Sequence, residues 1–147
     1  MSEPENVNVE LLCNSSFQCF CPFNCPSGLG NPIPSLTSNQ TFCTAVIKPK
    51  HGVRIIINVN SVSGTSPTLS ISASLGNYEP TLSIVSNISS TGTWVIHIAE
   101  DGTVTLNANG TLSTIGKISM PADTICLNFT VGGTSPSFDI SAWVEYD

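Results

Sequence analysis

The sequence predicts an all-β protein: an antiparallel β-sandwich or jelly roll of about eight strands, with a cysteine-rich N-terminal arm. Ser, Thr, Asn and β-branched residues are abundant in the 147-residue chain, which is poor in the Ala, Leu, Glu and Lys mixture that helices prefer. Short runs of alternating apolar and polar residues are separated by Gly, Pro and Asn-Gly or Asp-Gly turns. A unit of strand, Gly-Pro corner and strand also occurs twice. We therefore expect almost no helix.

The beginning of the chain differs in composition from the rest. Residues 7–12 alternate weakly and are expected to form an edge strand. From residue 13 to about residue 40, Cys, Pro, Gly, Asn and Ser dominate. A connection of that length without strands is uncommon inside a compact domain. The sequence therefore predicts a cysteine-rich arm or loop at residues 1–40 and a β-sandwich domain at residues 41–147.

The periodic part of the chain supplies the predicted strands. In the strand at residues 53–62, Asn60 and Ser61 shift the alternation before Val62, as an inserted bulge residue would. The other strands are expected at residues 41–48, 68–77, 81–86, 93–99, 103–106, 111–119, 125–131 and 137–146.

Two turn signals organise the middle of the sandwich. Asp101-Gly102 and Asn109-Gly110 each lie between alternating runs, and both dipeptides tolerate the positive φ angles of tight hairpin turns. Residues 93–118 are therefore predicted to form a three-stranded meander.

Six cysteines carry the most specific chemistry of the sequence: Cys13, Cys19, Cys21, Cys25, Cys43 and Cys126. Cys43 and Cys126 both lie within predicted strands, and a disulfide between them is the favoured single pairing, although the sequence cannot choose among the full pairings. For the cluster of four, disulfides compete with a zinc site and with unpaired buried thiols. The spacing C-x5-C-x-C-x3-C fits paired zinc knuckles poorly. We favour disulfides and predict no metal and no cofactor.

The sequence favours a protein that is not an enzyme. It contains no nucleophile elbow, P-loop, zinc-protease or EF-hand pattern. Asp139 and Glu145 share a strand face and could in principle form a glycosidase pair, but nothing selects them. His97 is expected to be a half-exposed strand residue.

Charge and hydropathy restrict the partners. The net charge is −6 with only four Lys and Arg residues, which argues against nucleic-acid binding. No segment approaches the roughly 20 apolar residues of a membrane span. The acidic amino terminus lacks the features of a secretory signal, so we expect synthesis in a host cytoplasm. Phe17, Phe20 and Phe23 are candidates for anchoring the arm to a partner, or for capping the open end of the sandwich.

The repeated corner resembles a known group of proteins. Residues 62–69 read V-S-G-T-S-P-T-L and residues 131–138 read V-G-G-T-S-P-S-F. Both corners, in this order, are typical of small β-rich proteins encoded among the head and tail genes of tailed phages. The resemblance covers residues 54–75 and 125–146 and excludes the cysteine-rich segment. It implies a virion structural protein, in particular a capsid decoration protein that contacts the major capsid or another virion protein and forms a homo-oligomer, with a trimer favoured.

Two other functions remain open. One is an extracellular filament or surface-layer subunit that assembles by strand exchange, although such subunits normally need an export signal. The other is a carbohydrate-binding module with stacking faces from Trp94, Trp143, Tyr78 and Tyr146. Trp143 and Tyr146 point to opposite sides of one predicted strand, which weighs against a shared aromatic face.

Overall fold

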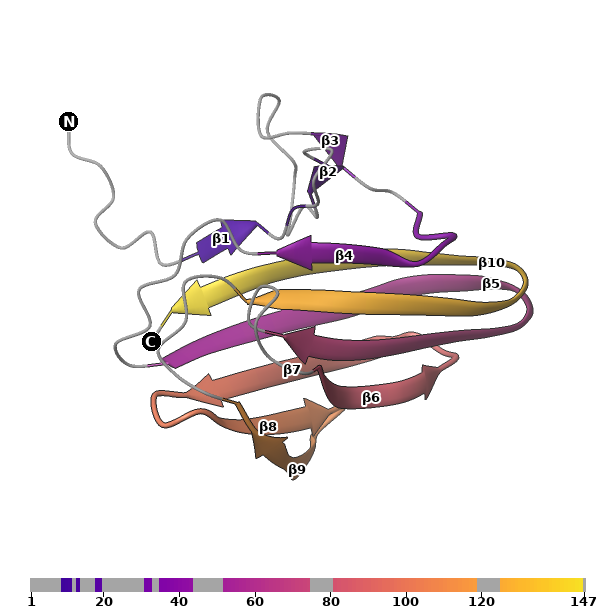
Figure 1. The fold of residues 1–147 in the computed structure, drawn as a ribbon. Coiled ribbons are helices and arrows are strands. Elements are labelled where there is room, and N and C mark those ends of the chain that lie inside the picture. The colour runs from indigo at the N-terminus through magenta and orange to yellow at the C-terminus, as the bar shows by residue number, and fades with distance from the viewer. Residues whose placement is uncertain are drawn as a thin grey trace.

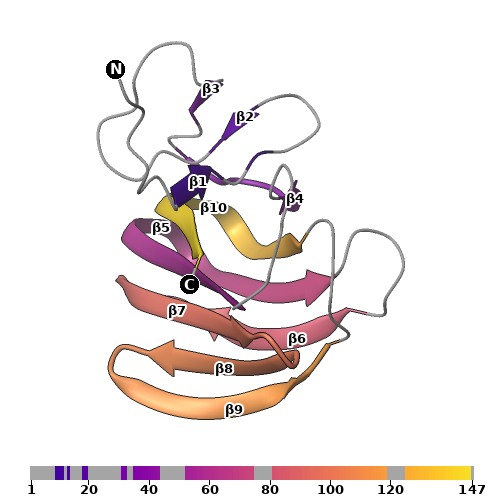
Figure 2. The same ribbon diagram turned by 90° about the vertical axis from the view of Figure 1, so that its left-hand side faces the viewer.

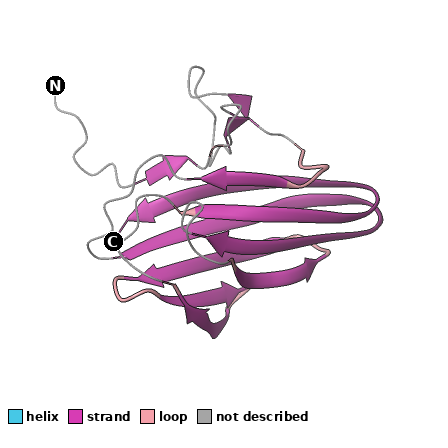
Figure 3. Ribbon diagram, in the orientation of Figure 1, coloured by secondary structure: helices cyan, strands magenta, loops and turns pink. Residues whose placement is uncertain are grey.

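The computed structural model describes residues 9–11, 13, 18–19, 31–32, 35–43, 52–74, 81–118 and 125–146. Within these ranges the regular structure is β-strand and no helix occurs, as Figure 3 shows. The all-β prediction is confirmed. No helix in this part of the chain has the length and hydropathy of a membrane span. The strands are β1 (Val9–Leu11), β2 (Gln18–Cys19), β3 (Asn31–Pro32), β4 (Gln40–Cys43), β5 (Gly52–Ser74), β6 (Leu82–Ile88), β7 (Gly92–Ala99), β8 (Thr103–Ala108), β9 (Thr111–Lys117) and β10 (Cys126–Tyr146).

The two longest strands, β5 and β10, form one folded ribbon. They pair antiparallel over nearly their whole length, from Val53 opposite Tyr146 to Ser74 opposite Cys126. This ribbon bends back on itself near its middle, at the right-hand end of Figure 1. The predicted strands at residues 53–62 and 68–77 therefore belong to one strand, β5, and each half of the ribbon contributes two strands to one layer.

The two halves of the ribbon define the two layers of the sandwich. The first layer contains β5 residues 52–62 and β10 residues 137–146, continues through β7, β8 and β9, and has β1 along β10. Figure 2 shows β7, β8 and β9 following β5 in this order. The second layer contains β5 residues 69–74 and β10 residues 126–131, flanked by β6 and β4. This arrangement agrees with the predicted antiparallel sandwich.

The core lies between the layers because alternate residues of each strand point inward. In β5, Val53, Ile55 and Ile57 are all 0% exposed. Phe42 of β4 and Phe129 of β10 contact each other edge to face, with ring centroids 5.6 Å apart. Burying one such side chain contributes about 1.5–3 kcal/mol. The same alternation fixes which side chains of the first layer face outward.

The two corner sequences form a single structural unit. Gly64 and Gly133 have φ angles of +111° and +106°, and Ser66 and Ser135 have φ angles of +50° and +51°. A Cβ atom on Gly64 would lie 2.6 Å from the carbonyl oxygen of Ser135, and one on Gly133 would lie 2.5 Å from that of Ser66. The two copies thus interlock with nearly identical, reciprocal contacts. The motif occurs twice because the bend of a two-stranded ribbon needs it once in each strand.

The bulge predicted in β5 is confirmed. Ser61 lies opposite Asp139, whereas Val59 lies opposite Ile140, so Asn60 has no opposite residue in β10. An extra residue of this kind restores the inward alternation on both sides of the irregularity.

Both predicted hairpin turns and the three-stranded meander are also confirmed. Gly102 and Gly110 have φ angles of +92° and +98° in the turns that join β7 to β8 and β8 to β9. The side-chain oxygen of Asn109 accepts a hydrogen bond of 2.8 Å from the backbone N–H of Thr93, which ties the second turn to the start of β7.

The Asp101 carboxylate is expected to stabilise the first hairpin in a pH-dependent way. It accepts a hydrogen bond of 2.9 Å from the backbone N–H of Thr103. This bond, together with one from the Thr103 hydroxyl, lowers the pKa of Asp101 below its ordinary value of 3.8. A depressed pKa gives stability that is present above the unfolded-state pKa and is lost as the pH falls through the folded-state value.

We therefore expect Asp101→Ala to reduce stability at pH 7 and to have a smaller effect at pH 2. Urea unfolding of both variants at the two pH values measures the difference. Asp101→Asn, which keeps an acceptor but does not titrate, is the control. An Asp101→Ala effect of equal size at both pH values would contradict a role for the charged carboxylate.

Parts of the predicted arm contact the sandwich along β10. β1 pairs with residues 143–145, and Leu36, which is 2% exposed, exchanges backbone hydrogen bonds with Phe138. The side-chain oxygen of Asn39 accepts a hydrogen bond of 2.8 Å from the Val131 backbone N–H. The segment from Leu36 to β4 therefore follows β10 from the first layer to the second. The boundary at residue 40 stays a prediction.

Candidate functional site

The outer face of the first layer carries two parallel rows of side chains from five strands. Across β10, β5, β7, β8 and β9, the first row consists of Trp143, Ile56, Val95, Asn107 and Leu112. In the same order, the second row consists of Glu145, Arg54, His97, Thr105 and Thr114. Neighbours within a row are about 4.8 Å apart and the rows are about 7 Å apart. We call these the Trp143 row and the Arg54 row.

Glu145 connects the two rows. Its Oε2 accepts a hydrogen bond of 3.1 Å from the indole N–H of Trp143, and its Oε1 lies 3.3 Å from a guanidinium nitrogen of Arg54. The Arg54 and Glu145 side chains are 47% and 36% exposed, so solvent screens the ion pair and it contributes only about 0–1 kcal/mol. Its main effect is to orient the indole and the guanidinium on the surface.

A shallow hollow lies toward the β9 side of this face. Its volume is about 340 Å³, and its lining combines polar and apolar side chains from both rows: Arg54, Val95, His97, Thr105, Asn107 and Leu112. Leu112 is 69% exposed and is the one large exposed hydrophobic residue among those described. The guanidinium, imidazole, hydroxyl and amide groups can hydrogen-bond to a small polar ligand, while Val95 and Leu112 can contact its apolar part.

The neighbouring part of the face is already hydrogen-bonded within the sheet. The Thr93 hydroxyl donates to the Asn58 side-chain oxygen at 2.7 Å, and the Asn60 amide donates to the Ser141 hydroxyl at 3.0 Å. Such cross-strand pairs stabilise the sheet. The hollow is the candidate for a ligand site because it is recessed and brings hydrogen-bonding and apolar side chains together.

The favoured disulfide, between Cys43 and Cys126, is present. The two residues lie opposite each other in β4 and β10, with Cα atoms 4.0 Å apart. Cys13 exchanges backbone hydrogen bonds of 3.1 and 2.6 Å with Cys43, and its own sulfur is also in a disulfide. A disulfide sulfur is not a thiolate, so Cys13 in this bonded state is not a zinc ligand.

Several other predicted site residues lie outside the described part of the chain or are described only by their backbone. Cys19 belongs to β2 and Tyr146 to β10, with no side-chain description. Outside the described ranges lie Phe17, Phe20, Phe23, Cys21, Cys25 and Tyr78.

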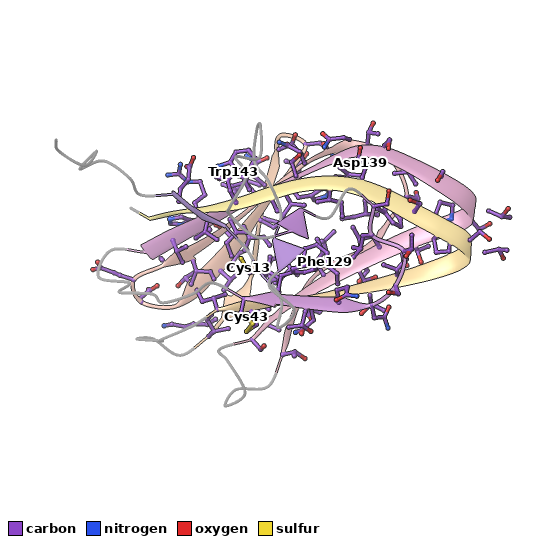
Figure 4. All side chains as sticks on the ribbon, turned by 90° about the horizontal axis from the view of Figure 1, so that it is seen from above. Cys13, Cys43, Phe129, Asp139 and Trp143 are labelled. Carbon is purple, nitrogen blue, oxygen red and sulfur yellow. A yellow bond between two sulfur atoms is a disulfide. The ribbon has the colours of Figure 1, made fainter. Side chains whose placement is uncertain are left out.

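The aromatic candidates divide between core and surface. Trp94 is only 6% exposed and packs in the core, so the expectation that it offers a stacking face is wrong. Its alternation with Ile96 and Ile98, both fully buried, explains this position. Trp143 faces outward and is half-buried. Figure 4 shows Trp143 on one side of the sandwich and Cys43 on the other, with Phe129 between the layers.

The carboxylates Asp139 and Glu145 do not form a catalytic pair. They are six positions apart on one strand, which places them about 20 Å apart. Glycosidase carboxyl pairs are about 5–9.5 Å apart. His97 is half-exposed, as predicted, and contributes to the hollow.

Sequence reasoning missed most of the hollow. It did not select Arg54, Val95, Thr105, Asn107 or Leu112, because their grouping depends on the register of strands that are far apart in the sequence. Two signals were available: the alternation of inward and outward residues in each strand, and the two hairpin turns. In combination they align β7, β8 and β9. The β5 register could not be obtained in this way.

No known protein family and no curated protein matches the sequence. Solved structures are similar in fold. The SPRY domain of human HERC1 is 9% identical with a TM-score of 0.50, and the match covers 71% of this chain and 82% of that chain. The metal-free carbohydrate recognition domain of Emp46p is 10% identical with a TM-score of 0.51, covering 76% and 81%. The NEUZ domain of Neuralized from Drosophila melanogaster is 7% identical with a TM-score of 0.50, covering 95% of both chains. This likeness shows a shared β-sandwich fold alone.

Proposed function

We propose that the chain is a structural protein of a virus particle that decorates the shell and acts through contacts rather than catalysis. The observation that carries this proposal is the interlocked corner. Gly64 and Gly133 approach the opposite strand so closely that the two motifs form one unit. The resemblance to tailed-phage structural proteins therefore lies in a feature that defines the body of the fold.

Covalent cross-linking fits this role. A decoration protein has to keep its shape on an exposed particle surface. The Cys43–Cys126 disulfide closes a loop with a sequence separation of 83 and so restricts the unfolded chain. Weak contacts of each subunit, repeated around a symmetric shell, add up to stable attachment. That the chain is not an enzyme, and that it forms a trimer, stay predictions.

The N-terminal segment is the proposed attachment element. Its described parts run along β10, where β1 pairs with residues 143–145 and Leu36 pairs with Phe138. Phe17, Phe20 and Phe23 are the proposed anchors.

The proposal predicts that the chain is present in purified virus particles. Mass spectrometry of the particles and immunogold labelling should detect it at the particle surface. Its absence from purified particles would overturn the assignment.

In a binding assay with particles that lack the protein, the triple Phe→Ser variant at positions 17, 20 and 23 should lose at least tenfold in affinity. Leu112→Ser, which removes an exposed apolar side chain elsewhere, is the control and should bind normally.

A carbohydrate-binding module is the second candidate. The observation that favours it is the hollow on the outer face of the first layer, which combines hydrogen-bonding and apolar side chains. The Emp46p domain, a carbohydrate recognition domain by name, shares the fold. At 10% identity this likeness carries no ligand over to the present chain.

A further inference from the structure

We propose that the hollow between β5 and β9 binds a neutral sugar. This inference rests on the second candidate function and deepens it by naming the class of sugar; it does not depend on the shell-decorating role. The volume of about 340 Å³ is at the small end of the range for small-molecule sites. The hollow therefore suits one or two sugar rings rather than a large cofactor.

The arrangement of side chains matches the two-sided character of a sugar ring. A pyranose has hydroxyl groups around its edge and apolar C–H groups on its faces. In the hollow, the Trp143 row contributes apolar Val95 and Leu112 on either side of the Asn107 amide. The adjacent row contributes the hydrogen-bonding groups of Arg54, His97 and Thr105. With the rows about 7 Å apart, one ring can contact both.

The charges of the site favour a neutral ligand over an anion. The guanidinium of Arg54 is paired with Glu145 at 3.3 Å, and the chain as a whole carries a net charge of −6. A sulfate, phosphate or acidic sugar beside Arg54 would lie near the Glu145 carboxylate. A neutral sugar can instead donate hydroxyl hydrogen bonds to the carboxylate and accept them from the guanidinium.

Trp143 supplies a second contact for a longer chain of sugars. It lies in the same row as Val95, separated from it by Ile56, and its indole is held by Glu145. The distance from the Trp143 strand to the Val95 strand is about 10 Å. An oligosaccharide that lies along the row can therefore reach the indole, and we expect trisaccharides to bind more tightly than monosaccharides.

NMR titration of the ¹⁵N-labelled chain tests the proposal. The probes are maltotriose, cellotriose, chitotriose, mannotriose and lactose, each up to 10 mM, with sialyllactose and sodium sulfate as anionic probes. Because the hollow is shallow, we expect at least one neutral sugar to bind with a dissociation constant in roughly the millimolar range. The shifted amides should centre on β7, β8 and β9. No shift there with any neutral probe, or a response to the anionic probes alone, would overturn the proposal.

Matched variants separate this site from general surface effects. Thr105→Ala, inside the hollow, should weaken binding at least fivefold, and Leu112→Ser should do the same. Thr130→Ala makes the same threonine change at an exposed position outside the hollow, on β10 of the second layer, and should leave binding unchanged. Equal affinities for Thr105→Ala and Thr130→Ala would contradict the assignment. Detection in virus particles does not depend on the hollow, so the two proposals can fail separately.

Discussion

Replacing Gly133 by alanine is expected to lower the free energy of unfolding by about 3 kcal/mol. The added Cβ would lie 2.5 Å from the carbonyl oxygen of Ser66, so the corner would have to open. The alanine would also have to keep a φ angle of +106°, which side chains rarely adopt. Gly64→Ala is expected to have the same effect, because its Cβ would meet the Ser135 carbonyl oxygen at 2.6 Å. Urea unfolding of the purified variants measures both losses.

Gly110→Ala is the matched control for these variants. Gly110 has a similar φ angle of +98°, but an added Cβ would meet no atom within 4 Å. Its substitution should therefore cost only backbone strain, about 1 kcal/mol. The Gly64→Ala/Gly133→Ala double variant should lose less than the sum of the two single losses, because both changes open the same corner. Losses equal to that of Gly110→Ala would contradict the interlocked contact.

Features that depend on neighbouring residues could be predicted from the sequence. The parity change at Asn60 identified the bulge, and the Asp-Gly and Asn-Gly dipeptides identified both hairpins. Each of these signals lies within a few residues of the structure it determines. The strand alternation likewise predicted the outward position of His97.

The pairing of the two corners could not be derived from the sequence. Gly64 and Gly133 lie far apart in the chain, and a local pattern does not state which strand will be opposite. Local patterns therefore predict two separate corners and divide β5 into two strands. The hollow has the same origin, because Arg54 meets His97 only through the long-range register of β5 and β7. The buried position of Trp94 follows from its alternation with Ile96 and Ile98 in the same strand.

The register explains how the corner and the hollow are related. The bulge at Asn60 separates the corner from the part of β5 that carries Arg54. Without the extra residue, the alternation of β5 would be out of phase on one side, and the outward residues there would turn into the core. The inserted residue therefore lets the ribbon bend at one end and present an ordered outer face at the other.

Removing the Cys43–Cys126 disulfide is expected to have the largest effect on stability, about 4 kcal/mol for the Cys43→Ala/Cys126→Ala double variant. The sequence separation is 83, so the cross-link removes much of the freedom of the unfolded chain. It also joins β4 to β10 at the edge of the second layer. Replacing both cysteines avoids a free thiol that could exchange with the disulfide of Cys13. Urea unfolding under non-reducing conditions measures the loss.

The next cross-strand pair on the same face of the sheet provides the control for this prediction. Thr41 lies opposite Asn128, and the Thr41 hydroxyl donates a hydrogen bond of 2.8 Å to the Asn128 side-chain oxygen. The Thr41→Ala/Asn128→Ala variant removes this noncovalent link between the same two strands and keeps the disulfide. It also removes a long hydrogen bond of 3.4 Å from the Asn128 amide to the Ser72 hydroxyl of β5. It should cost only about 1 kcal/mol. If both double variants lost the same free energy, the stabilisation would come from local pairing of β4 with β10, and the covalent restriction of the unfolded chain would not be its source.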